Sequence, residues 1–535
     1  MSAPAGERSE TPDGLERVLD GDAISRRAFA ARVSLLLGSA AAASVRTDIA
    51  GAQTPSKTSF VIAQGGDVSR LDPHMSTVVH DTAVSFNVFD NLVSRRRDGR
   101  LEPSLATSWE LVSPTLWRFV LRRGVTFHNG DPFTAADVKF SIERTQDPAA
   151  KTLVRTVFTT VERVEVSGPH AVLLHTRKPD PLLPARLAFF GGQIIPKSHF
   201  ERVSAEGFNA RPVGTGPLRF VEHIKSDRVV LERSSGYWGG DIAAERVTFR
   251  AIPETGPRVA ALLKGEADLI TTLPPDHVER VDMHPSTRVE ETLYAGLHLL
   301  VVDSRRPPLD NPKVKQALSL AIDREAILKD MWHGRGLVPN GPIPKGDNFY
   351  DDARPPFKYD PALARQRLRE GSYKGEVIYL ESSSGYLTND KPMSEALISM
   401  WQDVGLNVKL EIHEFSVMMQ KLRERSFKGL RLGSPASTLG DPDGMMWRLL
   451  GPGGAHDTWR HPRFDELGEA ARFSIDEEFR SRCYRAMVSI FLEYLPWIPI
   501  IQPVEWYGVR RSVDWKPYPT QQMELRQFNL KLRRA

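Results

Sequence analysis

A helical pattern that runs directly into a strand pattern is the feature that most constrains the fold of this 535-residue chain. In KPMSEALISMWQDVGLNVKLEI, residues 391–412, apolar side chains first recur at helical spacing and then alternate. The helical positions are Met393, Leu397, Met400 and Val404, and the alternating positions are Leu406, Val408, Leu410 and Ile412. Gly405, between them, suits the left-handed position just beyond a helix. The stretch predicts a helix followed by a half-buried strand.

Two more segments carry related signals. In DNPKVKQALSLAIDREAI, Asn311 can cap a helix and Pro312 fits its first turn. In RVAALLKGEADLI, a short helix should end near Gly265, and a strand should follow over 267–270. Because helix and strand signals alternate along the chain, the sequence predicts a mixed α/β fold. Its 41% hydrophobic content is enough for two or three domains.

The N-terminal segment has the features of a twin-arginine export signal. Adjacent Arg26 and Arg27 precede Phe29 and a weakly apolar run over 33–45. That run is shorter than the roughly 20 residues that span a bilayer. An Ala-Gly-Ala cleavage site ends at Ala52, so we expect a mature periplasmic protein that begins directly after it. A buried N-terminal helix is the alternative, which the scarcity of large side chains disfavours.

Charge and cysteine content exclude several classes of protein. Lys and Arg exceed Asp and Glu by 71 to 67, and the surplus is spread along the chain, so nucleic-acid binding is not indicated. The only cysteine, Cys483, can form no disulfide within the chain and cannot accept a lipid at the cleavage site. An iron–sulfur cluster needs about four cysteines. Because common nucleotide, zinc and hydrolase motifs are also absent, we expect no cofactor, and an exported enzyme is the weakest hypothesis.

Residues 121–144, LRRGVTFHNGDPFTAADVKFSIER, concentrate polar side chains as many active sites do. Local structure explains them: a strand at the start, an Asn-Gly turn, and a capping box formed by Thr134 and Asp137 before a helix. An acid/base pair of His128 and Asp131 is the alternative. We interpret the stretch as scaffold.

The sequence SLATSWELVSPTLWRFVLRRGVTFHNGDPFTAADVKFSIER resembles the signature of the extracellular solute-binding protein family 5. The family comprises dipeptide, oligopeptide and nickel-complex binders of ATP-driven importers. Further matches follow in the family's order and cover nearly all of the chain after the signal: 212–240, 258–270, 308–327, 400–411 and 440–444.

The resemblance implies a two-lobed periplasmic binding protein-like II fold of cluster C, with an extra subdomain in the first lobe. A ligand held between the lobes stabilises their closed arrangement. A membrane permease reads that arrangement and an ATPase drives transport, while the binding protein, expected to be a monomer, does no covalent chemistry. The predicted ranges are 53–90, 213–296 and 506–535 for the first lobe, 91–212 for the extra subdomain, and 297–505 for the second lobe.

The family's architecture also suggests which residues line the ligand chamber. On the first lobe the candidates are Gln64, Leu71, His74, Thr215 and Gly216. On the second lobe they are Tyr386, Ser437, Thr438, Asp441 and Trp459. Each has a structural alternative, such as a turn for the acid or a core position for the tryptophan.

The chain lacks the residues with which dipeptide binders hold the two charged ends of their ligand. They hold its ammonium with an acid just before the G-D-P-D segment, where this chain has Ser437, Thr438 and Leu439. They hold its carboxylate with an arginine in the loop that corresponds to ESSSGYLTND, which contains none. A longer peptide held by its backbone, a capped or modified peptide, or another polar solute therefore remains possible.

Two other ligand-binding hypotheses stay open. His74 and His80 lie close to Asp81 in the sequence, and His456 lies close to His461. Neither group is a tight cluster, so no metal site is predicted. A metal would arrive inside a small chelate such as a nickel complex. A sensor that presents its ligand to a membrane receptor would share the same fold.

Overall fold

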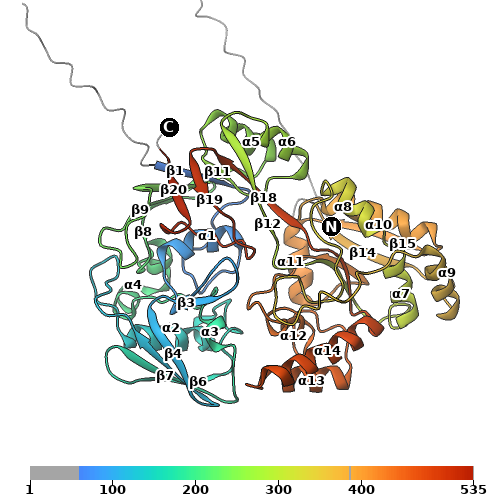
Figure 1. Cartoon of the computed structure of the whole chain (residues 1–535), viewed down its shortest axis with the longest axis horizontal. Coiled ribbons are helices and arrows are strands. Elements are labelled where there is room, and N and C mark those ends of the chain that lie inside the picture. Colours follow the sequence, from blue (N-terminus) through green and yellow to red (C-terminus); the bar gives the residue numbers. More distant parts are fainter. Residues whose placement is uncertain (1–58, 385–386, 534–535) are drawn as a thin grey trace, which may run out of the picture. The chain divides into compact units, whose positions relative to one another are not determined.

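The computed structural model describes residues 59–384 and 387–533. Strands and helices alternate in this part of the chain (Figure 1), and the strands form three large sheets. This arrangement confirms the predicted α/β class. Within the described ranges, no helix has the length and apolar character needed to cross a bilayer. The predicted export signal and the candidate Tyr386 lie outside the described residues.

A seven-stranded sheet combines strands from both ends and the middle of the described chain. In order across the sheet they are β12 (Thr287–Leu293), β18 (Val504–Arg510), β11 (Leu269–Ile270), β1 (Ser59–Gln64), β10 (Arg246–Ala251), β9 (Arg228–Arg233) and β8 (Leu218–Ile224). β1 pairs in parallel with β10 and β11, and the other pairings are antiparallel. β18 brings the end of the chain back into this sheet. Its core includes fully buried Phe60, Ile62 and Val247.

Short elements surround this sheet. The helices are α1 (Val79–Val88), α5 (Thr255–Lys264) and α6 (Val278–Asp282), the last preceded by the 3-10 turn η2 (Pro275–His277). β19 (Val513–Trp515) and β20 (Leu530–Leu532) form a two-stranded ribbon near the C-terminus. α5 ends at Gly265, whose φ of 78° is the left-handed conformation expected there.

A four-stranded antiparallel sheet lies entirely within residues 91–212. Its order is β4 (Ala106–Ser113), β5 (Leu116–Leu121), β7 (Ala171–Thr176) and β6 (Val161–Val166). The hairpin β2 (Val93–Arg95) and β3 (Leu101–Pro103) precedes it, and α2 (Ala135–Gln146), η1 (Pro148–Ala150), α3 (Leu183–Arg186) and α4 (Lys197–Ala210) accompany it. The capping box of Thr134 and Asp137 at the start of α2 is confirmed. The stretch 121–144 therefore begins with β5 and ends in α2, as predicted.

A five-stranded sheet organises residues 297–501. Its order is β15 (Val408–His413), β14 (Ile378–Ser383), β16 (Leu430–Gly433), β13 (His298–Val302) and β17 (Trp497–Ile501). Its helices are α7 (Pro312–Leu320), α8 (Arg324–Met331), α9 (Pro361–Glu370), α10 (Asp390–Asp403), α11 (Phe415–Glu424), the 3-10 turn η3 (Pro442–Gly444), α12 (Met446–Leu450), α13 (Pro462–Arg472) and α14 (Glu477–Tyr494).

The local predictions for this region are confirmed. Asn311 accepts a hydrogen bond from the Lys313 N–H at the start of α7. α10 runs through Gly405, at φ 92°, into β15. Burial along β15 decreases from Val408 to Ile412, which is 40% exposed, because β15 is an edge strand. The exact residue boundaries of the lobes and the extra subdomain stay predictions.

Candidate functional site

A buried ion pair joins the region of the four-stranded sheet, which we call the extra subdomain, to the region of the five-stranded sheet, which we call the second lobe. Arg186 Nη2 donates to Asp443 Oδ2 at 2.6 Å, and Arg186 Nε donates to Asp180 Oδ2 at 3.0 Å. Burial alone would raise the pKa of the Asp443 carboxyl, but the nearby Arg186 guanidinium holds it below its usual value. Leu182 packs beside this pair in a small apolar cluster that includes Leu439 of the second lobe. The two parts of the chain therefore meet through a buried, charged contact.

The second lobe contributes a polar loop next to this contact. Ser437 Oγ donates to Asp347 Oδ2 at 2.5 Å, and the Ser437 N–H donates to the Ala295 carbonyl at 2.6 Å. Thr438 Oγ1 donates to the Gly444 carbonyl at 3.2 Å. Two predicted site residues thus lie side by side in this loop: Thr438 bonds within the second lobe, and Ser437 bonds both to Asp347 of that lobe and to Ala295 at the end of the predicted first-lobe range.

Asp441 is anchored inside the second lobe. Its Oδ2 accepts from Arg480 Nη2 at 2.8 Å, and its Oδ1 accepts from the Asp443 N–H at 3.0 Å and from the Tyr484 hydroxyl at 3.3 Å. The side chain is fully buried, and burial raises the pKa of its carboxyl. These contacts match the turn-shaping alternative considered from the sequence, and its contact with a ligand stays a prediction.

Arg95, at the end of β2, reaches this loop from the other side. A Cβ placed on Gly440 would lie 3.0 Å from Arg95 Nη1, so the guanidinium packs against the loop backbone. Asp347 and Asp441 both act electrostatically on Arg95. We call Arg95, Asp347, Ser437 and Asp441 the Arg95 site. Burial raises the pKa of the Asp347 carboxyl to about 7, while the Ser437 hydrogen bond opposes the rise.

The predicted residues near β1 have structural contacts. Gln64 is buried at the end of β1, and its carbonyl accepts from the Ile252 N–H. Leu71 lies in the core of the seven-stranded sheet. His74 Nε2 lies 2.9 Å from the Gln193 carbonyl, and its Nδ1 lies 2.9 Å from Arg144 Nη1. Burial lowers the pKa of His74 to about 4, so the ring is neutral at pH 7.

Thr215 belongs to a cluster centred on Asp90, a fully buried acid that we did not predict. Thr215 Oγ1 donates to Asp90 Oδ2 at 3.0 Å, Trp238 Nε1 donates to the same oxygen at 2.8 Å, and Arg526 Nη2 donates to Oδ1 at 2.6 Å. A Cβ on neighbouring Gly216 would lie 2.5 Å from the Asn87 carbonyl oxygen. Only glycine fits this close approach of two backbones. Contact of either predicted residue with a ligand stays a prediction.

Trp459 lies among aromatic side chains of the second lobe. It is buried, stacks on His461 with ring centroids 5.9 Å apart, and meets Phe464 edge to face at 5.1 Å. This position fits the core alternative considered from the sequence. A role as a pocket-side aromatic stays a prediction.

Arg95, Asp347 and Arg186 were missed because their partners are distant in sequence. Arg186 and Asp443 are 257 residues apart. Arg95 opens the run RRRDGR, which looks like an ordinary solvated hairpin. The one available signal was alternation along the strand, because side chains two residues apart share a face and Val93 is apolar.

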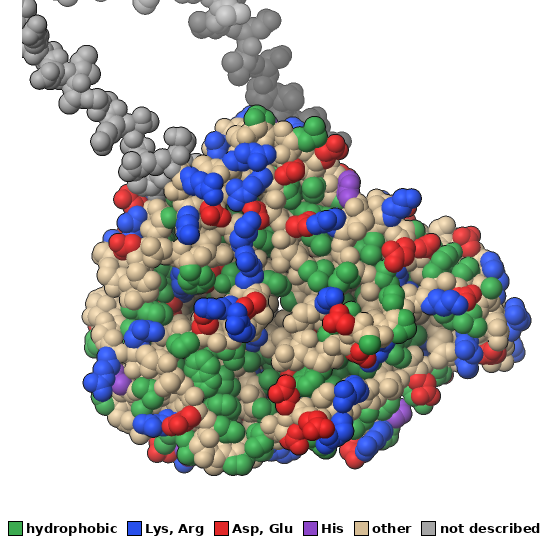
Figure 2. Space-filling model, in the orientation of Figure 1, with side chains coloured by type: hydrophobic (Ala, Val, Ile, Leu, Met, Phe, Trp, Pro, Cys, Tyr) green, Lys and Arg blue, Asp and Glu red, His purple; other side chains and the backbone are tan. Residues whose placement is uncertain are grey.

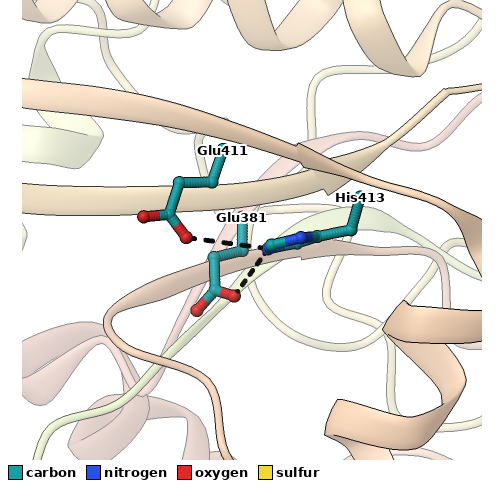
Figure 3. A group of neighbouring side chains, drawn as sticks. All are labelled: Glu381, Glu411 and His413. Carbon is teal, nitrogen blue, oxygen red and sulfur yellow. Dashed lines mark hydrogen bonds and ion pairs between the residues drawn. The ribbon is translucent and has the colours of Figure 1, made fainter. Parts of the chain in front are cut away.

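A carboxylate–histidine group on β14 and β15 has the composition of a metal site (Figure 3). His413 Nε2 lies 3.0 Å from Glu381 Oε2 and 3.7 Å from Glu411 Oε2. However, Lys421 Nζ lies 2.8 Å from Glu381 Oε2, and Lys428 Nζ lies 2.9 Å from Glu411. Because each carboxylate already has an ammonium partner, ion pairing accounts for this cluster.

The surface adds one charged groove. A groove of about 520 Å³ lies between the β2–β3 hairpin and the C-terminal ribbon. Its lining mixes both signs of charge: Arg96, Arg97, Asp98, Glu102, Asp514, Lys516, Tyr518, Phe528, Asn529 and Lys531. Figure 2 likewise shows basic side chains among acidic and apolar ones on the viewed face. The groove involves no residue of the second lobe, unlike the Arg95 site.

Comparison with known proteins places these features in a family. The model of the bacterial extracellular solute-binding proteins, family 5, matches residues 100–457. Di/tripeptide-binding protein 2 of Pseudomonas aeruginosa (strain UCBPP-PA14) is 27% identical over 461 residues, which cover 80% of this chain and 85% of that protein.

Two solved structures show the same fold. The dipeptide-binding protein of Pseudoalteromonas sp. SM9913, in complex with Met-Leu, superposes with a TM-score of 0.80 at 23% identity and covers 89% of this chain and 100% of its own. The binding protein AgaA of A. tumefaciens R10, in complex with agropinic acid, gives 0.79 at 24% identity and covers 89% and 99%. The predicted two-lobed fold is confirmed, and these relatives are binding proteins rather than enzymes. The chain belongs to the bacterial extracellular solute-binding proteins of family 5.

Proposed function

We propose that this protein captures a peptide or peptide-like solute between its two lobes and delivers it to the permease and ATPase of an ABC importer. The observation that carries the proposal is the Arg95 site, where Arg95 of the extra subdomain faces Asp347 and Ser437 of the second lobe. A ligand between such groups contacts both lobes at once. Its binding energy therefore favours closure, which is the signal that a permease reads.

The ligand names printed for relatives support a small polar solute. Di- and tripeptides, Met-Leu and agropinic acid all carry acidic or amide groups, and a largely buried chamber must satisfy such groups with polar partners. The ion-paired Glu381 group does not bear on the nickel-chelate alternative, because a metal inside a chelate needs no preformed protein site. We therefore place peptide-like solutes first.

Native mass spectrometry of the protein purified from its periplasm tests this proposal. We expect a one-to-one adduct that mild unfolding releases as a peptide or a small polar solute. A cofactor or a covalently modified product in its place would contradict the proposal. Genes for a permease and an ATPase beside this one would support import, and a receptor gene alone would favour a sensor.

We also propose that the protein works as a periplasmic monomer after twin-arginine export. Replacing Arg26 and Arg27 with Lys should abolish export, because the export machinery recognises the arginine pair. The measurement is the amount of processed protein in periplasmic and cytoplasmic fractions. A matched change of Arg8 and Arg17 to Lys, which alters two arginines that are not adjacent, should leave export intact. Unchanged export of the variant with Lys at positions 26 and 27 would contradict the prediction of a twin-arginine signal.

A further inference from the structure

Arg95 carries two buried hydrogen-bond donors that nothing in the described residues accepts. Its Nη1 donates to the Gly99 carbonyl at 3.0 Å within its own hairpin. Its Nε and Nη2 are shielded from solvent, and residues 59–384 and 387–533 provide neither with a hydrogen-bond partner. An unsatisfied buried donor costs about 1–3 kcal/mol, and more when it is charged. The fold therefore leaves two costly donors without a partner where the extra subdomain meets the second lobe.

The geometry of these two donors selects the group that would accept from them. The Nε–H and one Nη2–H of a guanidinium point the same way along one edge. That edge matches the two oxygens of a carboxylate, which it binds through two parallel hydrogen bonds. Such a fork is far more specific for a planar oxyanion than a single lysine ammonium.

Charges around Arg95 limit the acceptor to a singly charged group. Asp347 and Asp441 stabilise the Arg95 cation electrostatically, but neither forms a hydrogen bond with its free edge. Because Asp441 is already paired with Arg480, a doubly charged phosphate would meet the Asp347 carboxyl with only the Arg95 guanidinium to offset its two charges. A carboxylate carries one charge, which one guanidinium balances. The adjacent Arg96 does not change this balance, because its side chain is exposed and ion-paired with Glu102.

We propose that the Nε–Nη2 edge of Arg95 binds the carboxylate of the transported solute, so the solute is an organic acid or a peptide with a free acidic group. The inference rests on the proposed solute-binding function. It supplies a carboxylate clamp on the extra subdomain, whereas the second-lobe loop of residues 381–390 contains no arginine. The lobes then close over the carboxylate, because Gly440 lies directly against the guanidinium.

The test compares free acids with their primary amides. The probes are tripeptides, N-acetyl amino acids and small carboxylic acids, each supplied in both forms and screened against the mature protein by thermal shift and calorimetry. Wild type should bind an acid about 100-fold more tightly than its amide, as expected for two charge-assisted hydrogen bonds. Arg95→Gln should lose this discrimination, Arg95→Lys should keep part of it, and the control Arg97→Gln should keep all of it.

The ligand-free melting temperature separates binding from folding. Because Arg95→Gln removes two buried donors that have no partner, its melting temperature without solute should equal or exceed that of wild type. Three results would each overturn the inference: equal binding of acid and amide by wild type, no stabilisation by any acid, or full discrimination in Arg95→Gln. Water would then be the hydrogen-bond partner of the Nε–Nη2 edge. A protein that carries a neutral solute would overturn it too, while leaving the proposed function intact. A protein that neither carries nor binds any solute would contradict the proposed function itself.

Discussion

Replacing Arg186 with Met should loosen the closed arrangement of the lobes more than any other change of a single contact between them. Arg186 lies between Asp180 of its own subdomain and Asp443 of the second lobe, and all three side chains are buried. Removing one member of a buried ion pair typically costs about 3–5 kcal/mol, because a charge is left without compensation. When the lobes separate, water can solvate Asp443, so the penalty falls on the closed form.

Small-angle X-ray scattering of the ligand-free protein would show this as a larger radius of gyration. The apparent dissociation constant of the carried solute should rise by about 100-fold, since binding must then also offset the cost of closure. Asp443→Asn leaves Arg186 paired with Asp180, and besides the contact between the lobes it removes only the 3.6 Å ion pair of Asp443 with Arg472. Its effect should have the same direction and be smaller.

The chain provides a matched control for this prediction. Lys178 and Glu469 also connect the two parts of the chain, at 2.5 Å, but both side chains are about half exposed. Exposed ion pairs contribute about 0–1 kcal/mol. Glu469→Gln should therefore leave both the radius of gyration and the dissociation constant nearly unchanged. Equal effects of Arg186→Met and Glu469→Gln would show that burial of the Arg186 contact does not govern closure.

The sequence alone was sufficient to predict local structure that depends only on neighbouring residues along the chain. The capping box at Thr134, the cap at Asn311 and the left-handed Gly405 each need only a few adjacent residues, and each is confirmed. The order of family motifs extended this to the two-lobed fold. The alternating pattern predicted the half-buried strand β15, but it could not reveal that β15 lies at a sheet edge, where Ile412 is exposed.

The candidate site was less predictable because its charges are matched through tertiary contacts. Asp90 meets Arg526 across 436 residues, and Asp441 meets Arg480 across 39. No spacing rule links such pairs, so an acid in a loop looks equally suited to bind ligand or to hold the fold. Position in the family singled out the loop with Ser437 as a source of ligand-contacting residues, which stays a prediction, and the structure shows this loop packed against Arg95. It could not identify Arg95, whose importance comes from burial and from the absence of acceptors in the described residues.

Asp441 is the predicted site residue for which this ambiguity can be resolved most sharply. Arg480→Met should destabilise the fold by about 3–5 kcal/mol, because Asp441 would stay fully buried without its cation. Chemical denaturation followed by tryptophan fluorescence would measure the loss. Arg482→Met is the matched control two residues along α14, where the ion pair with Glu478 is exposed, and it should change stability by less than about 1 kcal/mol.

The contrast between these variants decides what Asp441 does. Both of its carboxylate oxygens accept hydrogen bonds from the second lobe, so a large loss of stability in Arg480→Met means that the carboxylate is committed to holding η3 against α14. Ligand recognition at the Arg95 site would then fall to Arg95 and to the groups around Ser437. If Arg480→Met were as mild as Arg482→Met, the Asp441 carboxylate would be free to turn towards a ligand. It would then supply the acid that the sequence lacks before its G-D-P-D segment.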